Sequence, residues 1–140
     1  MNMNEFINIF KDCKLVGEKI IIKSDLFKTI DFIKTDYSFT MLKDITAVDN
    51  GNGETELIYR LYSPENDEDV VISINVENET ESISKIFDSA VADEKEIYDL
   101  FGINFTGNTE LERLYMPESW EGHPLKKDYI ENDERLKWNE

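Results

Sequence analysis

Four carboxylates that could perform acid/base chemistry lie close together in this chain: Asp93, Glu94, Glu96 and Asp99. A pair of such groups can act as general acid and general base in a glycosidase-like or proton-transfer reaction. No neighbouring motif would shape a substrate pocket, and acids near a helix end are usually solvated or ion-paired. We therefore expect no catalytic residues, and we keep an acid/base enzyme using Glu94 or Glu96 as an alternative.

Metal and cofactor chemistry has few residues to draw on. His123 is the only histidine, and the nearby Glu118 and Glu121 are hard ligands too close in sequence to complete a convincing metal site with it. The pattern favours a structural histidine in a turn. No nucleophile elbow, dinucleotide fingerprint or phosphate loop can be drawn. We expect neither a metal nor a cofactor in this chain.

Cys13 is the only cysteine, so it can form no intrachain disulfide and cannot by itself hold an iron–sulfur cluster or a structural zinc ion. The absence of a disulfide framework and of a recognisable signal peptide predicts a cytoplasmic protein. The strongest apolar runs, 20–22 and 70–72, fall far short of the roughly 18 residues of a membrane span. No direct membrane span is expected.

The formal net charge of −16 excludes further classes of partner. Polyphosphate is repelled by such a surface, and the basic residues are scattered singly except for Lys126 and Lys127. Nucleic-acid binding is not expected. Anionic lipid is repelled by the same field, so any association with a membrane should pass through a partner protein.

The elements that position these groups follow from hydrophobic periodicity. Apolar residues at helical spacing predict helices, and alternation predicts strands. Ser24 and Ser82 are the expected N-caps of the second and third helices. The predicted helices are 4–13, 24–34, 82–87 and 90–102, and the predicted strands are 18–23, 39–48, 56–62 and 70–76. We expect an α+β fold, a small two-layer domain with a three- to four-stranded, mostly antiparallel sheet covered by helices.

The helix from Ala90 carries an apolar stripe and should end at Gly102, in a left-handed C-cap. Asp93 and Glu94 lie inside or beside the stripe, and carboxylates next to a buried face need a partner. Arg113 is the nearest cation that could fold back to them. The stripe consists of Ala90, Ile97, Leu100 and Phe101.

An extended tail rich in Pro and aromatic residues follows this helix. We divide the chain into a globular domain, 1–103, and a partner-binding tail, 104–140. The apolar side chains of the tail could pack on the globular part or on another protein. Their number is large for so small a body, which favours a partner. They are Leu111, Leu114, Tyr115, Met116, Trp120, Leu125, Tyr129 and Ile130.

Two segments resemble the signature of a known family: Glu96–Ile103, EIYDLFGI, and Met116–Tyr129, MPESWEGHPLKKDY. They are similar to the 30 kDa subunit of respiratory NADH dehydrogenase (complex I), whose family includes counterpart subunits of energy-converting, membrane-bound NiFe hydrogenases. Segments 42–49, 58–63 and 82–87 fit the same family in the same order, so the resemblance covers about 40–130.

Three departures from the family pattern fit a divergent, hydrogenase-type relative. The family usually has Trp at Ala92, Arg at Lys95 and Gly-His-Pro at 107–109, where this chain has Gly-Asn-Thr. The residues that match the family's structural signature are Glu94, Glu96, Asp99, Phe101 and Gly102.

The resemblance implies a non-catalytic, cofactor-free structural or assembly subunit of a membrane-associated redox complex. The complex would be an energy-converting NiFe hydrogenase or a complex I-type NADH:quinone oxidoreductase, at the inner face of the membrane. Partners would be the large subunit, 49 kDa-like or hydrogenase-like, and a neighbouring iron–sulfur subunit. Iron–sulfur, NiFe or flavin centres are expected only in the partners.

By this resemblance the tail would wrap the large subunit. Trp120 and Tyr129 are the candidate anchors, and ion pairs of Arg113, Lys127 and Asp128 would set the register. The remaining alternative is a free-standing acidic module that binds a basic protein. The full set of expected partner-binding residues is Arg113, Met116, Pro117, Trp120, Pro124, Leu125, Lys127, Asp128 and Tyr129.

Overall fold

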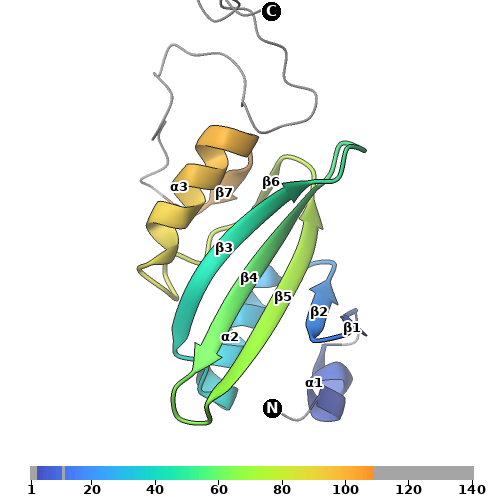
Figure 1. The fold of residues 1–140 in the computed structure, drawn as a ribbon, viewed down its shortest axis with the longest axis vertical. Coiled ribbons are helices and arrows are strands. Elements are labelled where there is room, and N and C mark those ends of the chain that lie inside the picture. The colour runs from blue at the N-terminus through green and yellow to red at the C-terminus, as the bar shows by residue number, and fades with distance from the viewer. Residues whose placement is uncertain (1–2, 11, 109–140) are drawn as a thin grey trace, which may run out of the picture.

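A computed structural model describes residues 3–10 and 12–108 of the chain (Figure 1). Within these residues three helices and seven strands follow one another in the order α1, β1, β2, α2, β3, β4, β5, β6, α3, β7. Their bounds are α1 Met3–Ile9, β1 Lys14–Val16, β2 Lys19–Ile22, α2 Leu26–Tyr37, β3 Met41–Asp49, β4 Thr55–Ser63, β5 Glu68–Val76, β6 Glu79–Glu81, α3 Ala90–Phe101 and β7 Asn104–Thr106.

The main sheet has five strands in the order β1-β2-β5-β4-β3. The β2/β5 pair is parallel and the other pairs are antiparallel. The prediction of an α+β fold with a mostly antiparallel sheet is confirmed. The sheet is wider than predicted because β1 and β2 form a hairpin at Gly17, which adopts φ 63, and this hairpin joins the edge of β5.

The core lies between α2 and one face of this sheet, and in Figure 1 α2 runs behind β3, β4 and β5. Tyr59 on β4 stands between Ile45 on β3 and Ile72 on β5, and all three side chains are buried. Their neighbours along each strand point to the other face, as the period of two requires. Helix α2 contributes the buried residues Leu26, Thr29, Ile30 and Ile33.

Helix α3 packs beside β3 at one edge of the sheet, and β6 pairs in parallel with β7 to form a second, two-stranded sheet. Lys34 of α2 ties the loop before α3 to the core. Its Nζ donates to the carbonyl of Ile86 at 2.8 Å and lies 4.9 Å from the ring centroid of Phe87.

Three local predictions were wrong. Asp25, in a left-handed conformation, occupies the N-cap position of α2 in place of Ser24. Residues 82–87 form turns and no helix, because Glu94 accepts hydrogen bonds from the Ser82 hydroxyl and the Ile83 N–H. The polar segment 77–81, which is in none of the predicted strands, contains β6, which pairs with β7.

Candidate functional site

Helix α3 carries the residues of the family signature and ends where the sequence predicts. Gly102 has φ 75, a left-handed conformation that costs glycine nothing, and its N–H donates to the Tyr98 carbonyl at 3.0 Å. The chain then reverses into β7, which buries Phe105 in the core. This reversal brings residues 104–108 back beside the N-terminal half of α3, where Asn108 reaches Glu94.

Glu94 is the centre of this site. Its side chain is fully buried, and its two carboxylate oxygens accept three hydrogen bonds. The Ser82 hydroxyl donates at 2.6 Å, the Ile83 backbone N–H at 2.9 Å and the Asn108 side-chain amide at 2.9 Å. The carboxylate thus joins α3, the segment after β6 and the second residue after β7. We call these four residues the Glu94 cluster.

The electrostatics of the cluster are set by burial. Desolvation raises the pKa of Glu94 above its usual value, and the hydrogen bonds from Ser82, Ile83 and Asn108 oppose this shift. All three donors are neutral groups. Glu94 is fully buried, and its hydrogen bonds hold these segments of the chain together.

Tyr59 lies near the same carboxylate with its side chain fully buried. Burial, with a smaller contribution from the charge of Glu94, raises its pKa well above 10. Within the described part of the chain its hydroxyl has no hydrogen-bond partner. A buried, unpaired hydroxyl is costly, and no pattern in the sequence indicates it.

The other acids of α3 differ from Glu94 in burial and in the groups that they contact. Asp93 is half-buried against β3; desolvation raises its pKa, opposed by a hydrogen bond with the backbone of Ile45. Glu96 is exposed, whereas Asp99 is fully buried. Phe101 is half-buried against the core. The four carboxylates of α3 thus lie in environments that differ in burial.

The expected partner-binding residues lie outside the described residues, and so does Arg113 as the expected cation for Asp93 or Glu94. Their roles stay predictions. Those residues are Arg113, Met116, Pro117, Trp120, Pro124, Leu125, Lys127, Asp128 and Tyr129.

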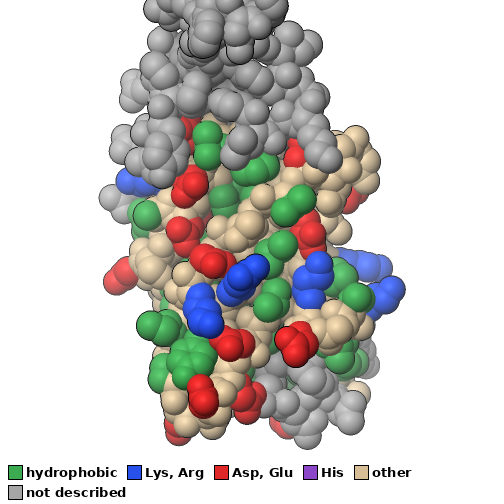
Figure 2. All heavy atoms as spheres, viewed as in Figure 1, with side chains coloured by type: hydrophobic (Ala, Val, Ile, Leu, Met, Phe, Trp, Pro, Cys, Tyr) green, Lys and Arg blue, Asp and Glu red, His purple; other side chains and the backbone are tan. Residues whose placement is uncertain are grey.

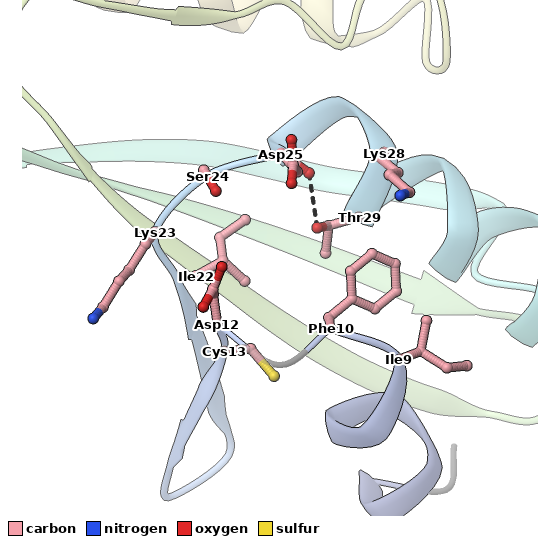
Figure 3. A pocket seen from close by; sticks show the side chains of 10 residues that line it. All are labelled: Ile9, Phe10, Asp12, Cys13, Ile22, Lys23, Ser24, Asp25, Lys28 and Thr29. Atoms are coloured by element: carbon pink, nitrogen blue, oxygen red, sulfur yellow. Dashed lines mark hydrogen bonds between the residues drawn. The ribbon is translucent and has the colours of Figure 1, made fainter.

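A small pocket of about 140 Å³ lies between α1 and the start of α2, and Cys13 is one of its lining residues (Figure 3). Desolvation raises the pKa of the Cys13 thiol, so it is protonated at neutral pH and a poor nucleophile. The Thr29 hydroxyl in this pocket donates to the Asp25 carbonyl at 2.8 Å. The pocket therefore presents no activated nucleophile.

Residues 3–10 and 12–108 contain no group of three or more His, Cys, Asp or Glu side chains placed to hold a metal ion. No helix in this part of the chain is long and apolar enough to cross a membrane.

Sequence reasoning missed Ser82 and Asn108 as partners of Glu94. One signal was available for Asn108, since it stands where the family pattern has a histidine. Both side chains carry an N–H that can donate to a carboxylate, so the substitution keeps a donor at this position. Ser82 carried no such signal because its hydroxyl was assigned to a helix cap.

Comparison with known proteins matches residues 20–135 to the family described as the respiratory-chain NADH dehydrogenase, 30 Kd subunit. The chain is 35% identical over 121 residues to the C subunit of the NADH-quinone oxidoreductase of Trichlorobacter lovleyi, covering 76% of this chain and 70% of that protein. It is 32% identical over 126 residues to the C/D subunit of the same enzyme from a Hydrogenobaculum species, covering 89% of this chain and 22% of that one. The chain thus spans about a fifth of that C/D relative.

A chain from the structure of the membrane-bound sulfane sulfur reductase, an archaeal respiratory membrane complex, has the same fold. The TM-score is 0.78 at 21% identity, covering 91% of this chain and 83% of that chain. The sequence match includes the helix that holds the Glu94 cluster and the segment predicted to be a partner-binding tail. The chain belongs to the family of the 30 kDa subunit of respiratory-chain NADH dehydrogenase.

Proposed function

We propose that this chain is a non-catalytic, cofactor-free subunit of a membrane-associated redox complex and that it docks on the large subunit. One observation carries the proposal. The match covers 70% of the Trichlorobacter relative, a C subunit, yet only 22% of the Hydrogenobaculum relative, a C/D subunit. The same domain is therefore a separate chain in one relative and part of a longer chain in another. The proposed partner is the counterpart of the remaining part of the longer chain.

The Glu94 cluster supports a role in presenting the tail. Asn108 is the last described residue, and its amide is held by the buried carboxylate of Glu94. The chain beyond it therefore starts from a fixed point on the body. A fixed starting point lowers the conformational entropy that a docking segment loses when it binds.

Two observations bear on the identity of the complex, and they favour different assemblies. The NADH-quinone oxidoreductase relatives favour a complex I-type assembly, and the departures at Ala92, Lys95 and 107–109 favour a hydrogenase-type assembly. In either case the subunit is peripheral on the inner face of the membrane, next to the large and iron–sulfur subunits. Flavin, iron–sulfur or NiFe centres reside in these partners.

The acid/base enzyme has less support. Glu94 is fully buried and both of its oxygens accept hydrogen bonds within the protein, so it has no path to a substrate. Glu96 is exposed, on a different side of α3. We expect the purified chain to turn over no substrate.

The test of docking uses the full-length chain, tagged and expressed in its source. Mass spectrometry of the co-purified proteins should identify a large subunit. The double variant Trp120→Ala/Tyr129→Ala should lose it, because the two anchors would no longer fill their pockets. Trp138→Ala is the matched control, since it removes an aromatic side chain beyond the matched residues 20–135.

The outcomes separate the alternatives. Recovery of NADH-oxidising subunits would select the complex I branch, and a large subunit with two CxxC pairs would select the hydrogenase branch. A double variant that still recovers the whole complex would refute the role of the tail. Loss of folding in the double variant, measured by circular dichroism, would make the tail part of the core.

A further inference from the structure

The main sheet has a second face, on the side away from α2, which the described elements leave uncovered. We call the surface of β2, β5, β4 and β3 on this side the open face; it faces the reader in Figures 1 and 2. Because successive side chains of a strand point to opposite faces, the neighbours of core residues lie on the open face. Ile58 lies between the core residues Leu57 and Tyr59, and Val71 lies between Val70 and Ile72, so both belong to the open face.

The open face is partly apolar. Met41 on β3 is 52% exposed and Val48 on the same strand is 44% exposed, two of the most exposed large apolar side chains in the described residues. Ile58 on β4 and Val71 on β5 are half-buried. Tyr62, the strand partner of Met41, extends this surface. A solvated sheet face would be expected to carry polar residues at these positions.

The charges on the open face are matched within the face. Lys19 Nζ lies 2.7 Å from Glu56 Oε2, Lys43 Nζ lies 2.8 Å from Asp69 Oδ1, and Arg60 Nε lies 3.8 Å from Asp44 Oδ1. Three cations and three carboxylates leave the face with no formal net charge. The whole chain carries −16, so the open face differs sharply from the rest of the molecule.

The two ends of the open face are acidic. The turn between β4 and β5 carries Glu65 and Asp67, and Glu54 lies directly before β4 at the other end. A protein that covers this face therefore meets a neutral, partly apolar centre between two acidic ends. The complementary surface has an apolar centre and basic residues at its rim.

We infer that the open face is a second docking surface, which binds a different protein subunit through a flat apolar patch with a basic rim. The inference rests on the proposed function, because it assumes a multisubunit complex. A second copy of this chain fits less well, since it would bring another acidic rim and a further charge of −16. The subunit would then be held at two places, by its tail and by its sheet.

The test compares two double variants of the tagged full-length chain. Met41→Arg/Val48→Arg changes the open face, and Ile9→Arg/Leu15→Arg is the matched control. Ile9 and Leu15 are 49% and 43% exposed on α1 and β1, away from the open face, and both pairs add the same charge. The open-face variant should recover at least about ten-fold less of one partner subunit other than the large subunit, while the control recovers as much of it as wild type does.

Hydroxyl-radical footprinting of the wild-type complex gives a readout that needs no variant. Met41 and Val48 should be labelled several-fold less in the complex than in the isolated chain, whereas Ile9 and Leu15 should be labelled equally in both.

The possible results are distinct. A wild-type chain that recovers no other subunit contradicts the proposed function and this inference together. Normal assembly of the Met41→Arg/Val48→Arg variant, or equal labelling of Met41 in both states, overturns this inference alone. If the isolated chain is a dimer and this variant makes it a monomer without affecting the complex, the open face is a contact between copies and the inference is wrong.

Discussion

The most consequential residue in the structure is Glu94, because its buried carboxylate has no cation among its three donors. A charge in the protein interior is tolerated only when its hydrogen-bonding capacity is met. Each donor comes from a different position along the chain, Ser82, Ile83 and Asn108. If one donor is lost, the cost of burying the Glu94 carboxylate is no longer fully offset, and the fold should become less stable.

Asn108→Ala tests this argument. Removing the amide that donates to Glu94 at 2.9 Å should lower the free energy of unfolding by about 1 to 3 kcal/mol, the range for a hydrogen bond to a buried charged group. Urea denaturation of the full-length chain measures the change. Asn104→Ala is the control, because that side chain is exposed on β7. Equal effects of the two substitutions would show that the Asn108 contact does not stabilise the fold.

The unpaired hydroxyl of Tyr59 predicts a change of opposite sign. Tyr59→Phe keeps the buried ring and removes a desolvated hydroxyl that has no partner within the described residues, so it should raise the free energy of unfolding by about 1 kcal/mol. Tyr62→Phe serves as the control, because the Tyr62 hydroxyl donates to Asp67 at 2.7 Å on the surface. A loss of stability in Tyr59→Phe would reveal that a bound water satisfies the hydroxyl.

The roles of individual residues could be predicted from the sequence where neighbouring residues in the chain determine them. The C-cap at Gly102 follows from helix geometry, and the structure confirms it. The need of Glu94 for a partner was also predicted from helix periodicity. Its actual partners lie 11 to 14 residues away and are brought in by the pairing of β6 with β7, which no local pattern encodes.

At the scale of elements, one interaction joins three strands of the sheet. Glu56 on β4 accepts hydrogen bonds from Lys19 on β2 and Ser73 on β5, and Lys19 lies at 2.7 Å. The hydrogen bond from Lys19, then that from Ser73, lowers the pKa of Glu56 below its usual 4.5. The folded state therefore releases this proton more readily than the unfolded state does.

The lowered pKa of Glu56 determines how the stability of the fold changes with pH. The contribution of Glu56 to stability is present above pH 4.5 and is lost as the pH falls through its lower, folded-state pKa. Glu56→Gln should cost about 1 kcal/mol at about pH 7, and the difference from wild type should shrink below pH 4.5. Thermal unfolding between about pH 3 and pH 7 provides the measurement, at about half-unit steps.

Glu54→Gln provides the control for this pH series, since it removes the same charge from the turn that precedes β4. A cost of Glu56→Gln that is the same at every pH would exclude an effect of the lowered pKa. Loss of packing would then be the remaining explanation for the cost of Glu56→Gln.

The three long strands, β3, β4 and β5, were predicted because each alternates over enough residues for a period of two to be seen. Strands β1, β6 and β7 have three residues each, too few for any period, and all three were missed. Their positions are set by pairing with distant segments. The predicted helix at 82–87 failed for the related reason that its first residues bond to Glu94.

At the scale of the whole molecule, the described residues form a body whose open face, on the side away from α2, carries three cations paired with three carboxylates. Residues 104–108 belong with this body, because β7 pairs with β6 and Phe105 is buried. The partner-binding role of the remaining tail stays a prediction. The proposed docking thus uses two surfaces of different kinds, an apolar tail and a charge-balanced sheet face.

Ionic strength separates this arrangement from an acidic module that holds a basic protein by charge alone. At about 1 M salt the Debye length falls to about 3 Å, which screens exposed charge pairs but leaves apolar contacts in place. We expect the partner subunits to stay bound when the complex is washed with salt rising from about 0.1 to 1 M, although assembly should slow because the basic rim no longer steers the encounter.

The isolated chain should remain folded over the same range, since salt screens the mutual repulsion of carboxylates in a chain of net charge −16. Full release of the partners from a body that is still folded would favour the acidic module over both docking surfaces.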